Sequence, residues 1–139
     1  RKESKFSEKP PVITMDGAAV FNFTLKRVPP MINNIMNDAA LENNDIDYFV
    51  LHQPNKYMLQ HIKKKMKLDS DKVPDETQSV YGNQNSASIP GTINGFLGQS
   101  YSSNKLTSLV AGFGIGLSWG AAIITTDQIY APNTFHLGE

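Results

Sequence analysis

The chain has 139 residues, 40% of them hydrophobic and 19% charged, which is the ordinary composition of one globular domain. Thirteen basic and thirteen acidic residues cancel, which argues against nucleic acid as the main ligand because phosphate binding usually shows as net positive charge. The lack of cysteine excludes disulfides and thiolate metal sites, and no apolar run approaches the roughly 18 residues of a membrane span. We therefore expect a cytoplasmic protein that binds neither nucleic acid nor a membrane.

The chain opens on a charged and irregular stretch that ends at Pro10-Pro11, and it does not begin with methionine. Residues 1–11 are therefore interpreted as a linker, and the sequence as a segment cut from a longer protein. Residues 12–15 form a short candidate strand, which Asp16-Gly17 ends.

Helical spacing of apolar residues predicts a helix over residues 18–28 and a second one over residues 30–42, separated at Pro29-Pro30, where proline should break the first. The continuous apolar run of residues 48–51 predicts a strand that is buried on both faces and ends at His52. A further amphipathic helix is expected over residues 55–67.

Residues 79–81 are a short strand candidate, and a helix is expected to begin near Ser86 or Ser88, with Pro90 in its first turn. Residues 106–111 and 117–126 predict two strands joined by a tight turn at residues 112–116, and so an antiparallel pair. The alternation of strands and helices indicates an α/β layered domain with a mostly parallel sheet and one antiparallel strand.

Polar residues follow the strands of this predicted sheet. His52 comes directly after one strand, and Gly82-Asn83 follows the short candidate at residues 79–81. Ligands of α/β sheets lie beyond the carboxyl ends of strands, so both side chains can open onto one rim. A histidine and an asparagine that aim N–H donors at one point can stabilise an oxyanion or an enolate.

Each of these features also has a simpler explanation. An isolated histidine is more often structural, and Asn83 taken alone is a turn residue. Lys63-Lys64-Lys65 is by default a solvated helix face, and the glycines of residues 112–116 lack the helix that a dinucleotide fingerprint requires. His52, His61 and His136 are too scattered to predict a metal site.

Four segments, in order and with similar spacing, resemble β-ketoacyl-ACP synthase III. Asp47-Tyr-Phe-Val-Leu-His-Gln-Pro-Asn55 resembles the segment around the family's active-site histidine, and Tyr81-Gly-Asn-Gln-Asn-Ser-Ala-Ser-Ile-Pro90 resembles its Gly-Asn-Thr-Ser-x-x-Ser-x-Pro segment. Residues 112–120 resemble its C-terminal Gly-rich strand pair, and residues 15–21 the opening of its second half.

The resemblance implies the C-terminal half of a thiolase-like condensing enzyme, with a layered mixed β-sheet flanked by helices over residues 12–126 and a tail over residues 127–139. The family joins an acyl group held on a cysteine to a malonyl thioester by decarboxylative Claisen condensation. Because the nucleophilic cysteine belongs to the N-terminal half, we expect this chain alone to be inactive.

The resemblance also assigns roles to residues. His52 and Asn83 match the catalytic histidine and asparagine, and the backbone N–H near Ile115 matches an oxyanion donor to the acyl-cysteine. Three residues are implied near the pantetheine channel, namely Gly17, Phe21 and Asn55. A basic residue that helps to dock the acidic carrier protein in the family aligns with Tyr57, so Lys56, Lys63 and Lys67 are expected to substitute for it.

The partners that the resemblance implies are the N-terminal half of the same protein, an acyl carrier protein, CoA thioesters and a second copy in a homodimer. No metal and no cofactor is expected, because the substrates carry their own phosphopantetheine. Two alternatives stay open: a non-catalytic thiolase-fold module that binds acyl-thioesters or supports a partner, and a related condensing enzyme making quinolone, resorcinol or polysaccharide-linked acyl groups.

Overall fold

The computed structural model describes residues 15–132 of the chain. Its centre is a three-stranded sheet of order β1-β2-β3, formed by β1 (Tyr48–Leu51), β2 (Lys105–Gly114) and β3 (Ser118–Asp127). β1 pairs in parallel with β2, and β2 pairs antiparallel with β3 over its whole length. The prediction of a mixed sheet flanked by helices is confirmed, with one parallel and one antiparallel pairing in the described part of the chain.

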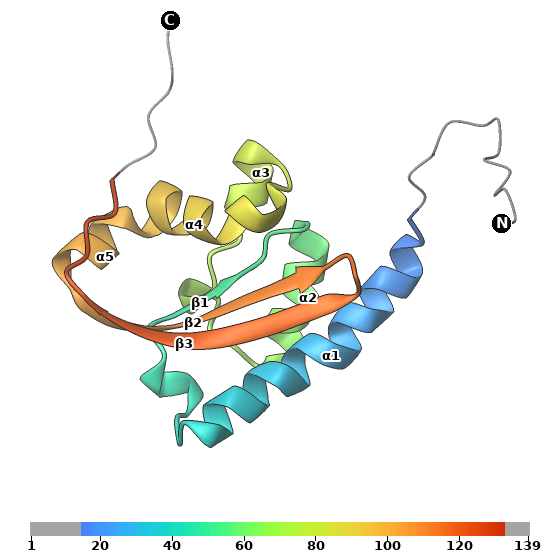
Figure 1. The fold of residues 1–139 in the computed structure, drawn as a ribbon, viewed down its shortest axis with the longest axis horizontal. Helices are drawn as coiled ribbons and strands as arrows, with labels where there is room; N and C mark the ends of the chain where they lie inside the picture. The colour runs from blue at the N-terminus through green and yellow to red at the C-terminus, as the bar shows by residue number, and fades with distance from the viewer. Residues whose placement is uncertain (1–14, 133–139) are drawn as a thin grey trace, which may run out of the picture.

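Helical segments supply the rest of the described fold. They are α1 (Gly17–Asp38), η1 (Asn43–Asp45), α2 (Lys56–Met66), η2 (Ser70–Lys72), α3 (Thr77–Tyr81), η3 (Asn85–Ala87), α4 (Ser88–Thr92), the π-helical turn η4 (Ile93–Leu97) and α5 (Gly98–Ser103). Figure 1 shows α1 and α2 on one side of the strands and α3, α4 and α5 on the other. Within residues 15–132, no helix is long and apolar enough to cross a membrane.

Alternating side chains of the strands build two cores, one on each face of the sheet. Phe49 and Leu51 of β1 face the α1–α2 side together with Leu109 of β2. Val50, the intervening residue, packs with Leu97 and Tyr101 on the opposite face. β1 is therefore buried on both faces, as its continuous apolar run predicted.

The predicted break at Pro29-Pro30 is wrong, because α1 continues through both prolines. A proline at position 29 removes the N–H that would bond the carbonyl of Leu25. In the structure Lys65 of α2 replaces that donor, with its Nζ 2.6 Å from the Leu25 oxygen. Val28 and Ile32 are also fully buried on either side of the prolines, so packing against the sheet stabilises one continuous helix.

Residues 79–81 are not a strand, because they belong to the short helix α3. Val80 is exposed, and α3 is attached to the fold by a buried bond of 2.7 Å between the hydroxyls of Thr77 and Thr92. The β-branched and aromatic residues that suggested a strand therefore lie outside the sheet. The candidate strand at residues 12–15 and the ends of the chain fall outside the described residues, apart from Met15.

The predicted antiparallel pair is present, but its turn is shorter than expected. β2 runs on to Gly114 and β3 begins at Ser118, so Gly112 and Gly114 lie in the strand. Gly116 alone takes a positive φ of 139° in the turn, and a Cβ at that position would overlap the Ser118 side chain. The hairpin tip is therefore Ile115-Gly116-Leu117.

Candidate functional site

His52 stands at the carboxyl end of β1. Its backbone N–H donates to the Ala111 carbonyl of β2 at 2.8 Å, which extends the parallel ladder by one residue and fixes where the side chain leaves the sheet. The imidazole is half-buried, and its ring lies edge-on to the ring of Phe113 with centroids 5.3 Å apart. The strand end thus holds the histidine at the rim that the sequence predicted.

The segment between α3 and α4 comes to the same place. The Nδ1 atom of His52 lies 2.7 Å from the hydroxyl of Ser88, the first residue of α4. The Ser88 hydroxyl in turn lies 2.8 Å from the carbonyl oxygen of Asn85. One ring nitrogen is therefore engaged by the protein, which leaves Nε2 as the nitrogen able to meet a ligand.

Burial lowers the pKa of the His52 imidazole from its usual value, and a hydrogen bond with the Asn85 backbone opposes part of this shift. The ring is therefore neutral at pH 7. A neutral imidazole can donate from only one of its two nitrogens, so its tautomer decides what it offers to a ligand.

Asn83 is held by the same turn. Its Oδ1 accepts the backbone N–H of Asn85 at 2.9 Å, which commits the oxygen end of the amide and leaves the Nδ2 hydrogens as donors. Ser88, five residues after Asn83, is hydrogen-bonded to the His52 ring, so the structure holds the segment that carries Asn83 against the predicted histidine. The side chain of Asn83 is exposed.

Ile115 lies at the tip of the β2–β3 hairpin, two residues beyond the Phe113 ring that contacts His52. Its side chain is 92% exposed and makes no part of the core. Figure 1 shows the hairpin tip at the same end of the sheet as the first turns of α1. The role expected of its backbone N–H stays a prediction.

The three residues predicted to lie near a pantetheine channel belong to the starts of two helices. Gly17 is the exposed first residue of α1, and Phe21 one turn later packs on the Tyr57 ring of α2 with centroids 5.4 Å apart. Asn55 is the N-cap of α2, where its Oδ1 accepts the Met58 N–H at 2.8 Å. Asn55 therefore stabilises the start of α2, independently of any contact that its Nδ2 makes with a ligand.

The three lysines predicted to dock a carrier protein differ in what they contact, and their docking role stays a prediction. Lys56 begins α2 and Lys67 is its C-cap, so roughly 16 Å of helix separates them. Lys63 pairs with Asp75 at 2.8 Å, with side chains only 12% and 13% exposed. The solvated face expected for residues 63–65 is therefore wrong at Lys63, and Lys65 is engaged by α1.

Sequence reasoning missed the residues that support His52. Ser88 and Asn85 lie in the small-residue stretch that it singled out, yet the reasoning gave neither a role. Phe113 was assigned to a turn, although its apolar neighbours on alternate positions indicated a strand. Gln53 is fully buried beside His52, and its Nε2 ties the Leu51 and Pro74 carbonyls together at 3.1 and 2.9 Å.

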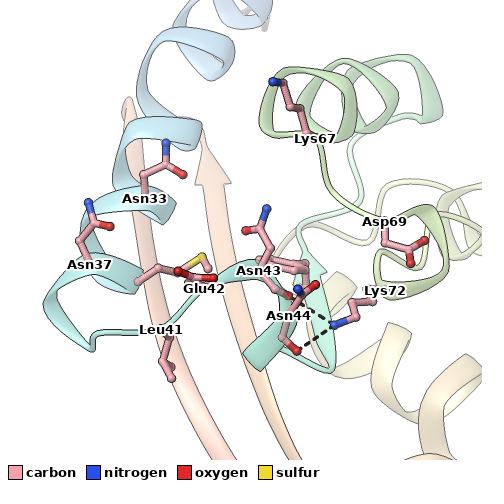
Figure 2. Close-up of a pocket in the computed structure, with 11 residues that line it drawn as sticks. Asn33, Asn37, Leu41, Glu42, Asn43, Asn44, Lys67, Asp69 and Lys72 are labelled. Carbon is pink, nitrogen blue, oxygen red and sulfur yellow. Dashed lines mark hydrogen bonds between the residues drawn. The ribbon is translucent and has the colours of Figure 1, made fainter.

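A polar hollow of about 520 Å³ lies at the other end of the sheet. Figure 2 shows Asn33 and Asn37 of α1 facing Asn43 and Asn44 of η1, with Lys72 below. The Lys72 Nζ donates to the carbonyls of Asn43, Asn44 and Ile46, so this cation is already committed to the fold. Among residues 15–132, no group of three histidines and carboxylates can hold a metal ion.

Comparison with known proteins places this chain in a family. Residues 36–126 match the family described as 3-oxoacyl-[acyl-carrier-protein (ACP)] synthase III C terminal. The chain is 40% identical over 118 residues to a β-ketoacyl-[acyl-carrier-protein] synthase III of Streptococcus agalactiae, covering 81% of this chain and 35% of that protein. A putative 3-oxoacyl-[acyl-carrier-protein] synthase 3 of Campylobacter jejuni is 32% identical over 119 residues, 86% of this chain and 33% of its own length.

Solved structures agree with the sequence relatives. A 3-oxoacyl-(acyl-carrier protein) synthase from Burkholderia xenovorans superposes with a TM-score of 0.82 at 34% identity, covering 86% of this chain and 34% of that one. A synthase III from Thermus thermophilus gives a TM-score of 0.76 at 28% identity, over 84% of this chain and 36% of the other. The chain thus spans about a third of the length of the proteins that it matches.

Proposed function

Because the chain belongs to the 3-oxoacyl-[acyl-carrier-protein] synthase III C-terminal family, we propose that it is the catalytic C-terminal half of an acyltransferase of that type. The proposed reaction is the decarboxylative Claisen condensation of an acyl primer with malonyl-ACP. The observation that carries the proposal is the 2.7 Å contact between His52 Nδ1 and the Ser88 hydroxyl, which holds the segment that carries Asn83 against the histidine at the carboxyl end of β1.

The proposed reaction requires hydrogen-bond donors at the thioester oxygen, and His52 and Asn83 can supply them. When the malonyl thioester breaks its bond to the carboxylate, CO₂ leaves and the electron pair moves into an enolate, so negative charge develops on the thioester oxygen. Donors at His52 Nε2 and Asn83 Nδ2 would stabilise that oxygen more strongly in the transition state than in the ground state. The enolate carbon then forms the new bond to the primer's carbonyl carbon, and the cysteine thiolate leaves.

The second half of the reaction uses the hairpin tip. Attack on the acyl-cysteine turns its carbonyl oxygen into an oxyanion, and the proposal assigns the Ile115 N–H as a donor to it. A backbone donor places no demand on the side chain, so isoleucine is tolerable there. Gly17, Phe21 and Asn55 are proposed to border the pantetheine arm, and Lys56 with Lys67 to attract the acidic carrier.

The proposal includes a partner half. The cysteine that holds the primer is assigned to an N-terminal half of the same protein, so this chain alone is expected to be inactive. Acyl-CoA and malonyl-ACP are the proposed substrates, with no further cofactor, and the full protein is proposed to be a cytoplasmic homodimer.

The test supplies the intact protein with acyl-CoA primers and malonyl-ACP and identifies the products by mass. A 3-oxoacyl-ACP product is expected from the wild type, and His52→Ala and Asn83→Ala should each lower kcat by about 10²–10³-fold. Ser86→Ala, an exposed change in the same segment, serves as the control. Condensation that survives both alanine variants unchanged would instead favour the non-catalytic, thioester-binding alternative.

A further inference from the structure

β3 is the outer strand of the sheet. In the described part of the chain the strand order is β1-β2-β3, so β3 is paired on one edge only. It pairs with β2 from Ser118 to Asp127 in one continuous register. Residues 118–126 contain no charged residue and no proline, which are devices by which proteins commonly keep an edge strand from pairing further. The outer edge of β3 is therefore open to another strand.

The hydrogen bonds between β1 and β2 show which residues of β3 face this edge. The carbonyls of Thr107 and Ala111 accept N–H groups on the β1 side, from Asp47 and His52. Odd-numbered residues of β2 thus direct their main-chain groups at β1, and even-numbered residues direct theirs at β3. Because Thr107 lies opposite Thr125, the odd-numbered residues of β3 direct theirs away from β2. The outward-facing residues are Trp119, Ala121, Ile123, Thr125 and Asp127.

Two copies of this strand can satisfy each other's outward-facing groups. If two antiparallel β3 strands are related by a two-fold axis at Ile123, their odd-numbered residues lie opposite one another and exchange hydrogen bonds. Trp119 then lies opposite Asp127 of the second copy. On the other face of the sheet, the small Ala122 lies opposite the larger Ile124 of the second copy. The pairing is therefore compatible with both the main chain and the side chains.

The charges at the two ends of β3 fit the same register. The guanidinium of Arg27 on α1 lies over the Trp119 ring, 5.5 Å from its centroid. Asp127 is exposed at the other end of the strand, roughly 27 Å from Trp119 at the usual rise of a strand. Within residues 15–132, neither Arg27 nor Asp127 has an ion-pair partner. The two-fold pairing brings Asp127 of each copy to the Trp119 and Arg27 of the other.

We propose that β3 is an interface between two copies of this chain, paired antiparallel about Ile123, with Arg27 of each copy facing Asp127 of the other. The inference builds on the homodimer of the proposed function, for which it names a surface, and it needs no part of the proposed reaction. A second copy fits this edge better than an unrelated strand, because the main-chain ladder and the opposite charges both repeat through the two-fold axis.

Disulfide cross-linking in the intact protein tests the register. Ile123→Cys would place two cysteines across the axis with Cα atoms about 5.5 Å apart, which a disulfide can span. After mild oxidation and digestion, mass spectrometry should find two copies of the peptide joined at this position, which has no other cysteine near it in the sequence. Ile115→Cys, at a position 92% exposed but far from the axis, should give at least 10-fold less self-linked peptide.

A proline in β3 tests the ladder. Thr125→Pro removes an outward-facing N–H without removing a hydrogen bond to β2, and proline is tolerated at such edge positions. Two hydrogen bonds are lost per dimer. At protein concentrations below the dissociation constant, the rate of cross-linking at position 123 should therefore fall by about 10-fold or more. Thr125→Val, which keeps the N–H, should cross-link like the parent.

A charge exchange tests the facing ends of the strands. Asp127→Arg should slow the cross-linking, and adding Arg27→Asp to the same protein should restore it. If Ile123→Cys prevents folding, the double variant Ala121→Cys with Thr125→Cys places cysteines opposite each other in the same register and serves for this exchange.

Equal yields for Ile123→Cys and Ile115→Cys would overturn the interface, as would an unchanged rate in Thr125→Pro or a charge exchange that fails to restore the link. A disulfide from position 123 to a cysteine outside this sequence would also overturn it, because the edge would then belong to the partner half. None of these measurements uses activity, so loss of the interface would leave the proposed condensation standing. Absence of condensation would likewise leave the interface standing.

Discussion

Both ends of the sheet carry polar side chains, but the side chains at each end are used differently. At the η1 end, the Lys72 ammonium donates hydrogen bonds to three backbone carbonyls. At the carboxyl end of β1, the protein hydrogen-bonds Nδ1 of His52 and Oδ1 of Asn83. Nε2 of His52 and Nδ2 of Asn83 are the atoms that could meet a ligand. The proposed site differs from the polar hollow in having donors that the protein holds at one end and leaves available at the other.

The largest expected effect comes from placing the same substitution at both ends. Asn83→Asp replaces the free amide donor by a carboxylate next to a developing negative charge, so kcat of condensation should fall by at least about 10²–10³-fold. Asn44→Asp in the polar hollow is the matched change and should leave kcat unaltered. Steady-state kinetics of the intact protein measures both, and equal losses would erase the distinction between the two ends.

Lys72→Met should have the opposite signature, a loss of stability with normal kcat. It removes a charged donor from three carbonyls, of which the Ile46 oxygen is partly buried, and should lower the free energy of unfolding by roughly 1–3 kcal/mol. Urea denaturation is the measurement, with the exposed Lys105→Met as control. A variant as stable as the control would mean that these bonds contribute nothing net.

Lys65→Met tests whether the Lys65 hydrogen bond is the reason that α1 stays continuous through Pro29-Pro30. The Leu25 carbonyl loses its replacement donor, so we expect a destabilisation of about 0.5–1.5 kcal/mol. The neighbouring exposed Lys64→Met should be close to neutral in the same denaturation experiment. Indistinguishable midpoints for the two variants would show that packing alone carries the helix through Pro29-Pro30.

The smallest expected effect is on the pH dependence of stability. Burial holds the pKa of folded His52 below its unfolded value of about 6.5, so the unfolded chain binds the proton more readily. The contribution is fully present above pH 6.5 and is lost as the pH falls from there through the lowered pKa. The His52→Gln variant should lose less stability than the wild type between pH 7.5 and 5.5 in parallel denaturation curves.

Local pattern predicted the elements whose evidence is local. The apolar run of β1, the amphipathic stripe of α2 and the antiparallel hairpin were predicted with boundaries within a few residues. Pro29-Pro30 misled because the donor that compensates for it lies forty residues away on another helix. Residues 79–81 misled because a β-like composition says nothing about whether a partner strand is available.

The candidate site shows the same division. The histidine after a buried strand and the asparagine after a glycine were identified from sequence, and Ser88 links the asparagine's segment to the histidine ring. Their catalytic roles stay predictions. Ser88 was not identified, because a serine among small polar residues carries no signal until its distance to the imidazole is known. Lys63 was misjudged for a similar reason, since its ion pair with Asp75 depends on the loop after α2.

The central claim is that an imidazole and a carboxamide serve the same thioester oxygen. A crystal structure of the intact protein with a malonyl thioester analogue that cannot lose CO₂ tests it most directly. The account predicts His52 Nε2 and Asn83 Nδ2 each within hydrogen-bonding distance, about 2.7–3.2 Å, of that one oxygen. A bound analogue whose carbonyl meets neither atom, or only one with the other turned into a separate cavity, would contradict it.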